Sequence, residues 1–259
     1  MSSIAIITDA DSCVPPALRT ALDIHVAPAD PALLLEAETI PKLRSEAGEP
    51  ALDDALAVCR TVIEAGATDL CYLTAGDDYG SPPDLEAALA SLEANVTTYS
   101  SGAALMGAGW QVIAAAEAIR DGATLDHAVA AARAVQANVQ VLAMLEHPEL
   151  ASAAGNAELG IVRHRALVYL RGPEVGIVSR PTKREDALAA LRDRFAESVS
   201  DASKVHVAVQ HAAAGPGADA LALWIERELA PARVLVAPLT RHAATRLGPR
   251  MLGLAWYEE

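Results

Sequence analysis

The chain alternates short, fully apolar runs with longer segments whose apolar residues recur at helical spacing. The first run, residues 4–7, predicts a strand that is buried on both faces. Small polar residues lead from it to Pro15 and Pro16, which favour the first turn of a helix because proline lacks the amide hydrogen that this turn leaves unpaired. Residues 24–27 predict a second strand. Strand, helix, strand is the repeating unit of parallel α/β sheets.

The same alternation continues to about residue 146. It predicts helices over residues 52–65, 82–88, 107–118 and 125–137, and strands over residues 69–74, 96–100 and 139–145. A short helix is also expected from Pro31 onward. Leu145-Glu146-His147-Pro148 then interrupts the pattern. We place a domain boundary there, so that residues 1–146 form an α/β domain with a mainly parallel sheet.

The second half of the chain has a different pattern of apolar runs. Two apolar runs, residues 161–170 and 175–179, are joined through Arg171-Gly172-Pro173, which favours an antiparallel hairpin. Thr182 and Glu185 have the spacing of a capping box before the next helix. Further strands are expected over residues 205–209 and 234–237, with a helix between them. Residues 147–259 therefore predict a second α/β domain with a mixed or antiparallel sheet.

Charge and composition narrow the range of functions. The net charge of −14 argues against nucleic acid and against anionic membrane surfaces, since both are bound through clustered basic residues. The longest apolar stretch, residues 103–116, is too short to span a bilayer. No signal peptide is visible, and the three scattered cysteines fit a reducing compartment. We expect a cytoplasmic protein.

Candidate binding residues lie where the predicted parallel strands end, because ligands of open α/β sheets bind at that edge. Thr8, Asp9 and Ser12 follow the first strand, and Thr74 and Ser100 end two later ones. No phosphate-binding glycine loop, nucleophile elbow or metal-ligand spacing occurs in the sequence. An acid–base pair formed by Asp77 and Asp78 would rest on adjacency alone. We therefore predict a binding protein with no catalytic residues, no metal and no cofactor.

Three stretches resemble one known family. The opening couples Thr8-Asp9 to a Val-Pro-Pro-x-Leu segment and to Ile-His-Val-x-Pro at residues 24–28. Ser100 precedes a glycine-bearing helix, and glycines and a tyrosine recur with matching spacing from Gly248 to Tyr257. These features are similar to the DegV family of bacterial fatty-acid-binding proteins. The resemblance implies a ligand tunnel between two domains, in which one fatty acid is held and its carboxylate presented to a separate fatty acid kinase.

The resemblance also implies a head-group site made of hydroxyls and a basic residue. The matching positions are Thr8, Asp9, Ser45, Thr74, Gly80, Ser81, Ser100, His242 and Arg246. Tyr99 stands where the family has an aspartate, and the arginine of a family Gly-Gly-Arg motif is absent near Gly155. Two alternatives stay open. The first is a solvated basic edge formed by Arg241, Arg246 and Arg250. The second is that the chain is a divergent relative that binds no fatty acid and acts as an interaction or regulatory protein, or binds another small anion.

Overall fold

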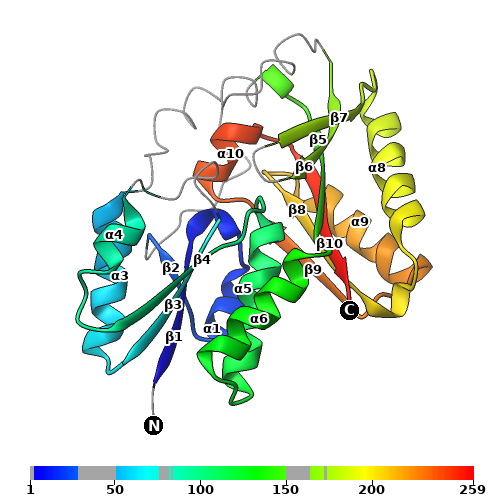
Figure 1. Cartoon of the computed structure of the whole chain (residues 1–259). Helices are drawn as coiled ribbons and strands as arrows, with labels where there is room; N and C mark the ends of the chain where they lie inside the picture. Colours follow the sequence, from blue (N-terminus) through cyan, green and yellow to red (C-terminus); the bar gives the residue numbers. More distant parts are fainter. Residues whose placement is uncertain (1–2, 29–50, 76–81, 83, 150–163, 172–173) are drawn as a thin grey trace. The chain divides into compact units, whose positions relative to one another are not determined.

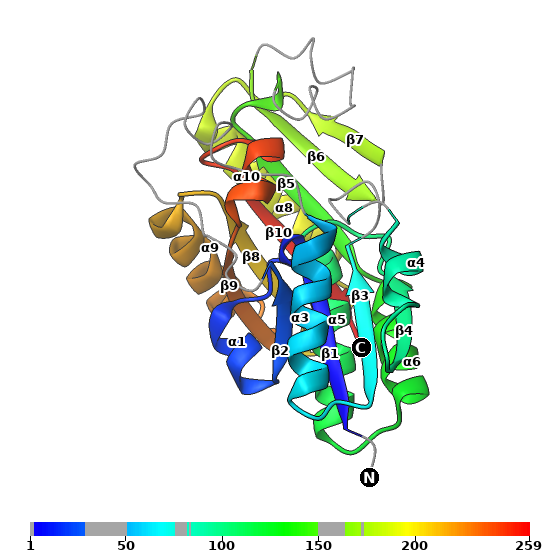
Figure 2. The ribbon, with the colours of Figure 1, turned by 90° about the vertical axis from the view of Figure 1, so that its left-hand side faces the viewer.

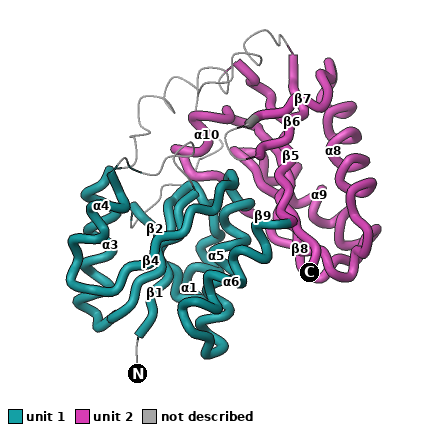
Figure 3. The backbone as a smooth tube through the Cα atoms, in the orientation of Figure 1, with its two compact units in different colours: residues 1–31, 49–137 teal, residues 32–48, 138–259 magenta. Residues whose placement is uncertain are grey.

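The protein consists of two compact units (Figure 3). Unit 1 contains residues 1–31 and 49–137, and unit 2 contains residues 32–48 and 138–259. The computed structural model describes residues 3–28, 51–75, 82, 84–149, 164–171 and 174–259. Ser45, Gly80, Ser81 and the short helix expected from Pro31 lie outside these ranges.

Unit 1 is built on a four-stranded sheet in the order β2-β1-β3-β4, and every neighbouring pair is parallel. The strands are β1 (Ile4–Asp9), β2 (Ile24–Ala27), β3 (Asp69–Thr74) and β4 (Asn95–Ser100). The helical elements are η1 (Ala10–Ser12), α1 (Pro16–Ala21), α3 (Leu52–Glu64), α4 (Leu85–Leu89), α5 (Met106–Arg120) and α6 (Leu125–Gln136). The parallel sheet predicted from the buried apolar runs is confirmed.

Helices cover both faces of this sheet. Helices α3 and α4 lie on one face, and α1, α5 and α6 lie on the other (Figures 1 and 2). Alternate residues of a strand point to opposite faces. Ile7 and Tyr72 accordingly pack with the buried side of α3, whereas Thr8 points toward the face that carries α5. Burial on both faces explains why β1 and β3 read as continuous apolar runs.

Unit 2 holds a six-stranded mixed sheet in the order β7-β6-β5-β10-β8-β9, in which β8 and β9 are parallel and the other pairs antiparallel. The strands are β5 (Gln140–Leu145), β6 (Ala166–Arg171), β7 (Glu174–Ser179), β8 (Val205–His211), β9 (Arg233–Pro238) and β10 (Leu252–Glu258). The helical elements are α8 (Arg184–Ser198), η4 (Ala202–Lys204), α9 (Gly215–Glu228) and α10 (Arg241–Leu247). Phe195 meets Trp256 edge to face in the core, with ring centroids 5.2 Å apart.

Two details differ from the sequence-based picture. Strand β5 pairs with β6 and β10, so it belongs to the sheet of unit 2, and unit 2 resumes at residue 138, ahead of the boundary expected after Glu146. The capping box predicted from Thr182 and Glu185 is wrong. Helix α8 has Lys183 at its N-cap and no side-chain cap, because Thr182 lies one position too early. Within the described ranges, none of the helices has the length and apolar character needed to cross a membrane.

Candidate functional site at the strand ends of unit 1

The structure gathers four of the predicted site residues at one edge of the unit 1 sheet. Thr8 and Asp9 end β1, and Thr74 and Ser100 end β3 and β4. Thr8 lies opposite Leu73 in the strand register, and Thr74 lies opposite Ser100. Because the strands are parallel, their carboxyl ends meet at the same edge. This is the position at which open α/β sheets bind ligands.

Asp9 ties the end of β1 to the exit of β3. Its Oδ1 accepts a hydrogen bond of 2.9 Å from the Tyr72 hydroxyl, and its Oδ2 accepts one of 3.0 Å from the backbone N–H of Ala75. Burial, together with the negative charge of Asp9, raises the pKa of Tyr72 well above its usual value, so this hydroxyl stays protonated as a donor. Asp9 is 4% exposed. Its geometry suits a residue that positions the two strand exits.

Thr8 and Ser12 carry buried hydroxyls without a partner. Both residues are 0% exposed, and neither Oγ1 of Thr8 nor Oγ of Ser12 has a hydrogen-bond partner in the described structure. Buried polar side chains are paired in the large majority of cases, and leaving one unpaired costs free energy of folding. These two hydroxyls are therefore open hydrogen-bonding positions at the strand end.

Helix α5 packs closely on the turn that carries Ser12. A Cβ atom built on Gly109 would lie 2.5 Å from the backbone oxygen of Ser12, far inside normal contact distance. This close approach of two backbone segments requires a glycine at position 109. Helix and turn together fix the position of Ser12 relative to α5.

The loop between β4 and α5 is held by side-chain amides. The backbone oxygen of Ser101 accepts hydrogen bonds from Nε2 of Gln136 at 2.8 Å and from Nε2 of Gln111 at 3.2 Å. Tyr99 donates its hydroxyl to Oε1 of Gln111 at 2.9 Å, and burial raises the pKa of Tyr99 to about 12. Ser100 is exposed beside this support. Tyr99, the residue that departs from the family pattern, thus has a structural role.

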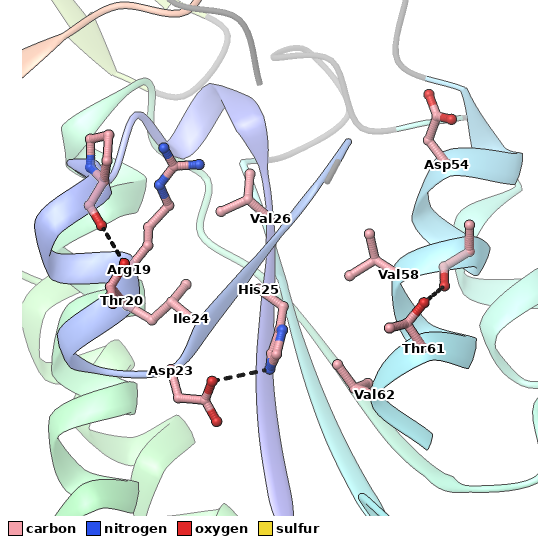
Figure 4. A pocket seen from close by; sticks show the side chains of 12 residues that line it. Arg19, Thr20, Asp23, Ile24, His25, Val26, Asp54, Val58, Thr61 and Val62 are labelled. Atoms are coloured by element: carbon pink, nitrogen blue, oxygen red, sulfur yellow. Dashed lines mark hydrogen bonds and ion pairs between the residues drawn. The ribbon is translucent and has the colours of Figure 1, made fainter. Parts of the chain in front are cut away.

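Unit 1 also has a groove away from these strand ends. It has a volume of about 490 Å³ and lies at the open edge of β2, between α1 and α3 (Figure 4). Arg19, His25 and Asp54 are among its lining residues, and Nε2 of His25 lies 3.6 Å from Oδ1 of Asp23. None of the predicted head-group residues lines the groove, so it is a separate feature.

Comparisons with known proteins identify the fold. No family model matches the chain, and no curated protein matches it. Solved structures match over the whole length. A Thermotoga maritima protein described as having a fatty acid binding function superposes with a TM-score of 0.83 and 16% identity, covering 100% of both chains. A Thermus thermophilus DegV family protein, described as binding fatty acid, has a TM-score of 0.82 and 21% identity, covering 99% of this chain and 100% of the other. A stearic acid-binding protein from Eubacterium ventriosum has a TM-score of 0.79 and 14% identity, covering 100% of this chain and 98% of the other.

The chain has the DegV fold. The resemblance inferred from the opening segment, the Ser100 region and the carboxyl-terminal segment is confirmed at the level of fold. In this DegV fold the two basic candidates, His242 and Arg246, lie on α10 of unit 2, one helical turn apart and partly buried. Their participation in a site with the strand-end residues of unit 1 stays a prediction, as does the tunnel between the domains.

Sequence reasoning missed two residues that support the DegV-fold strand ends. Tyr72 holds Asp9, and Gln111 holds the loop after β4. Both are polar groups inside otherwise apolar runs, and that pattern is the signal that could have identified them. Most buried polar side chains form a hydrogen bond within the fold.

Proposed function

We propose that the protein binds one fatty acid, with the carboxylate at the strand ends of unit 1. The observation that carries the proposal is the pair of buried, unpartnered hydroxyls of Thr8 and Ser12 at the edge where α/β sheets bind ligands. The full-length likeness to structures described as fatty-acid binding supports the choice of ligand. A ligand carboxylate would accept the hydrogen bonds that these hydroxyls do not make within the chain.

The remaining predicted residues complete the proposed head-group set. Thr74 and Ser100 share the strand-end edge with Thr8. Ser45, Gly80 and Ser81 belong to the proposal on sequence resemblance. Arg246 and His242 are the proposed basic partners, because an arginine pairs with a carboxylate through two parallel hydrogen bonds.

We further propose that the protein is a carrier that performs no chemistry itself and presents the carboxylate to a separate fatty acid kinase. In that arrangement the residues of this chain bind and orient the lipid, and the kinase supplies the phosphoryl transfer. The test is a reconstitution with a candidate kinase from the same organism. ATP consumption and acyl phosphate should require the kinase and the lipid-loaded protein together, and turnover by the kinase on free fatty acid at the same rate would refute the carrier role.

Native mass spectrometry of the protein as purified from a bacterial host tests the binding function. The proposal predicts a stoichiometric mass addition that organic extraction identifies as a fatty acid. A ligand-free mass that persists after incubation with several fatty acids would indicate the second candidate, a divergent DegV-fold protein with an interaction or regulatory role or another small anion as its ligand. The buried acids Asp9 and Asp11 beside the site favour the interaction or regulatory role, since they disfavour any anionic ligand there.

Arg246→Ala tests the proposed basic partner. Removing the arginine should weaken fatty acid binding by roughly tenfold or more, because a charge-assisted hydrogen bond would be lost. Arg241→Ala on the same helix is the matched control and should leave binding unchanged. Retention of full lipid occupancy by the Arg246→Ala protein would show that Arg246 belongs to a solvated basic edge.

A further inference from the structure

Unit 2 carries a cluster of charged side chains at one end of its sheet. The last residue of β5 pairs with the first residue of β6. The antiparallel register therefore brings Glu146, which follows β5, beside Arg165, which precedes β6. Strand β10 begins at the same end of the sheet, where Leu252 pairs with Met144 of β5 (Figure 1). The cluster contains none of the residues proposed to bind the fatty acid.

One carboxylate in this cluster holds two arginines. Oε2 of Glu146 lies 2.5 Å from Nε of Arg165, and Oε1 pairs with Nη1 of Arg184 at the start of α8. Arg165 also donates through Nη1 to the backbone oxygen of Thr182 at 2.8 Å. Arg184 donates to the backbone oxygen of Arg250 at 3.3 Å. The Glu146 side chain is 7% exposed, whereas those of the two arginines are 28% and 24% exposed, so both guanidinium groups are fixed in place yet reachable from solvent.

The cluster has more positive charge than its acids balance. Glu146 neutralises only one of the two arginines. Lys183, the N-cap residue of α8, pairs with Glu185 at 3.6 Å, and Arg250 adds a further exposed cation. These four basic and two acidic groups leave two positive charges in excess, in a chain whose net charge is −14. Asp186, the other acid in the first turn of α8, is exposed to solvent.

Both arginines keep donors that no contact within the described residues uses. A guanidinium group carries five N–H groups. The contacts above engage Nε and Nη1 of Arg165 and Nη1 of Arg184, which leaves Nη2 of each arginine available. Two guanidinium groups that share one carboxylate also repel each other, and a second anion would offset that repulsion.

An oxyanion with two negative charges fits this arrangement. Arginine binds phosphate through paired N–H groups, and the excess of two positive charges matches a dianion. We propose that Arg165 and Arg184 bind a phosphate dianion, either free or as the phosphoryl group of a small ligand, and that Glu146 positions both guanidinium groups. Lys183 and Arg250 add to the local positive potential. The inference is independent of fatty acid binding, because every residue it uses lies outside the proposed head-group set.

Isothermal titration calorimetry of the full chain with inorganic phosphate at pH 8 tests the site directly. The titration should saturate at one phosphate per chain, whereas potassium chloride at equal ionic strength should give no saturable heat. A parallel titration with glycerol 3-phosphate distinguishes the two sources of the phosphoryl group. Equal or tighter binding of this ester assigns the site to a phosphorylated ligand, and weaker binding assigns it to free phosphate. Absence of saturable binding by both would overturn the inference.

Arg165→Ala and Arg184→Ala test the two proposed ligands. Each variant leaves Glu146 paired with the other arginine, so the fold should be retained. Each should weaken phosphate binding by about tenfold or more, because charge-assisted hydrogen bonds are lost. Arg194→Ala is the matched control on the same helix: its Nη1 lies 3.6 Å from Oε2 of Glu197 in an exposed pair, and its loss should leave the affinity unchanged. Equal weakening by all three substitutions would indicate non-specific attraction and overturn the site.

Thermal unfolding separates phosphate binding from a purely structural role. Phosphate should raise the Tm of the parent and of the Arg194→Ala protein by mass action, and this rise should be smaller in Arg165→Ala and Arg184→Ala. These two variants could instead have a lowered Tm in phosphate-free buffer and gain as much from phosphate as the parent. That result would show that the cluster only stabilises unit 2 and would overturn the inference.

Discussion

At the residue scale, two buried tyrosines donate hydrogen bonds to different kinds of acceptor, one to a carboxylate and one to a neutral amide. Tyr72 donates to the carboxylate of Asp9, and Tyr99 donates to the neutral amide of Gln111, both at 2.9 Å. Both tyrosines are buried, at 0% and 7% exposure. Hydrogen bonds to charged groups contribute about twice as much as neutral ones. The support of Asp9 should therefore contribute more to the stability of unit 1.

Replacing each tyrosine by phenylalanine tests this difference. Tyr72→Phe should lower the free energy of unfolding by about 2 kcal/mol, because it removes one of the donors of a buried carboxylate. Tyr99→Phe should lower it by about 1 kcal/mol. Urea unfolding of the two variants beside the parent protein measures both values. An equal or larger loss in Tyr99→Phe would contradict the assignment of Asp9 as a buried, ionised anchor.

Two buried thiols predict how stability changes with pH. Burial raises the pKa of Cys59 from 9.0 to about 11 and that of Cys71 to about 12. Between about pH 9 and 11 the unfolded chain loses thiol protons that the folded chain keeps, so the free energy of unfolding is highest below pH 9 and falls as pH rises. Denaturant unfolding at pH 8, 9 and 10 measures the slope. If Cys71→Val does not reduce the fall of the free energy of unfolding with pH, the buried thiols are not its cause.

At the scale of elements, the contact between η1 and α5 is the most constrained packing around the site. Gly109 lets the helix lie against the backbone oxygen of Ser12, and an added Cβ would also lie 2.6 Å from the sulfur of Met106. Backbone atoms cannot move aside as a flexible side chain can. The position of the turn that carries Ser12 therefore depends on the absence of a side chain at Gly109.

Gly109→Ala should destabilise the protein by about 1–3 kcal/mol, even though alanine is the better helix former, because the clash is with backbone. Gly217 in α9 is the matched control, since a Cβ there would meet nothing within 4 Å. Gly217→Ala should stabilise the protein by about 0.5–1 kcal/mol. Thermal unfolding of both variants measures the effects. Stabilisation by Gly109→Ala would mean that α5 is not seated on the turn.

Elements with strong local signals could be predicted from the sequence. The apolar runs located β1, β2 and β3 closely, because strands buried on both faces admit few polar residues. The start of α4 was less predictable. That helix begins at Leu85, three residues after the start predicted at residue 82, because Asp84 takes a left-handed conformation with φ 62°. Such a turn depends on packing more than on residue preference.

The candidate site could be predicted only in part, for a related reason. The position at the end of a predicted strand was enough to identify Thr8, Asp9 and Ser12 as candidate binding residues. The partner of Asp9, Tyr72, lies 63 residues away in the chain, and local periodicity carries no information about such a pair. That the hydroxyls of Thr8 and Ser12 lack a hydrogen-bond partner can likewise be recognised only from the positions of the surrounding residues.

At the scale of the whole molecule, the negative charge is unevenly distributed. The described residues of unit 2 contain 13 acidic and 13 basic side chains, whereas those of unit 1 contain 13 acidic and four basic ones. Both basic candidates for the head group, His242 and Arg246, belong to unit 2.

The central claim, that this DegV-fold protein binds one fatty acid, is tested most directly by titrating delipidated protein with hexadecanoic acid. Native mass spectrometry and thermal unfolding are followed on the same samples. The account predicts saturation at one lipid per chain and a Tm that rises with lipid concentration, because a ligand that binds only the folded state stabilises it by mass action. An unchanged mass and a constant Tm over the whole titration would contradict it.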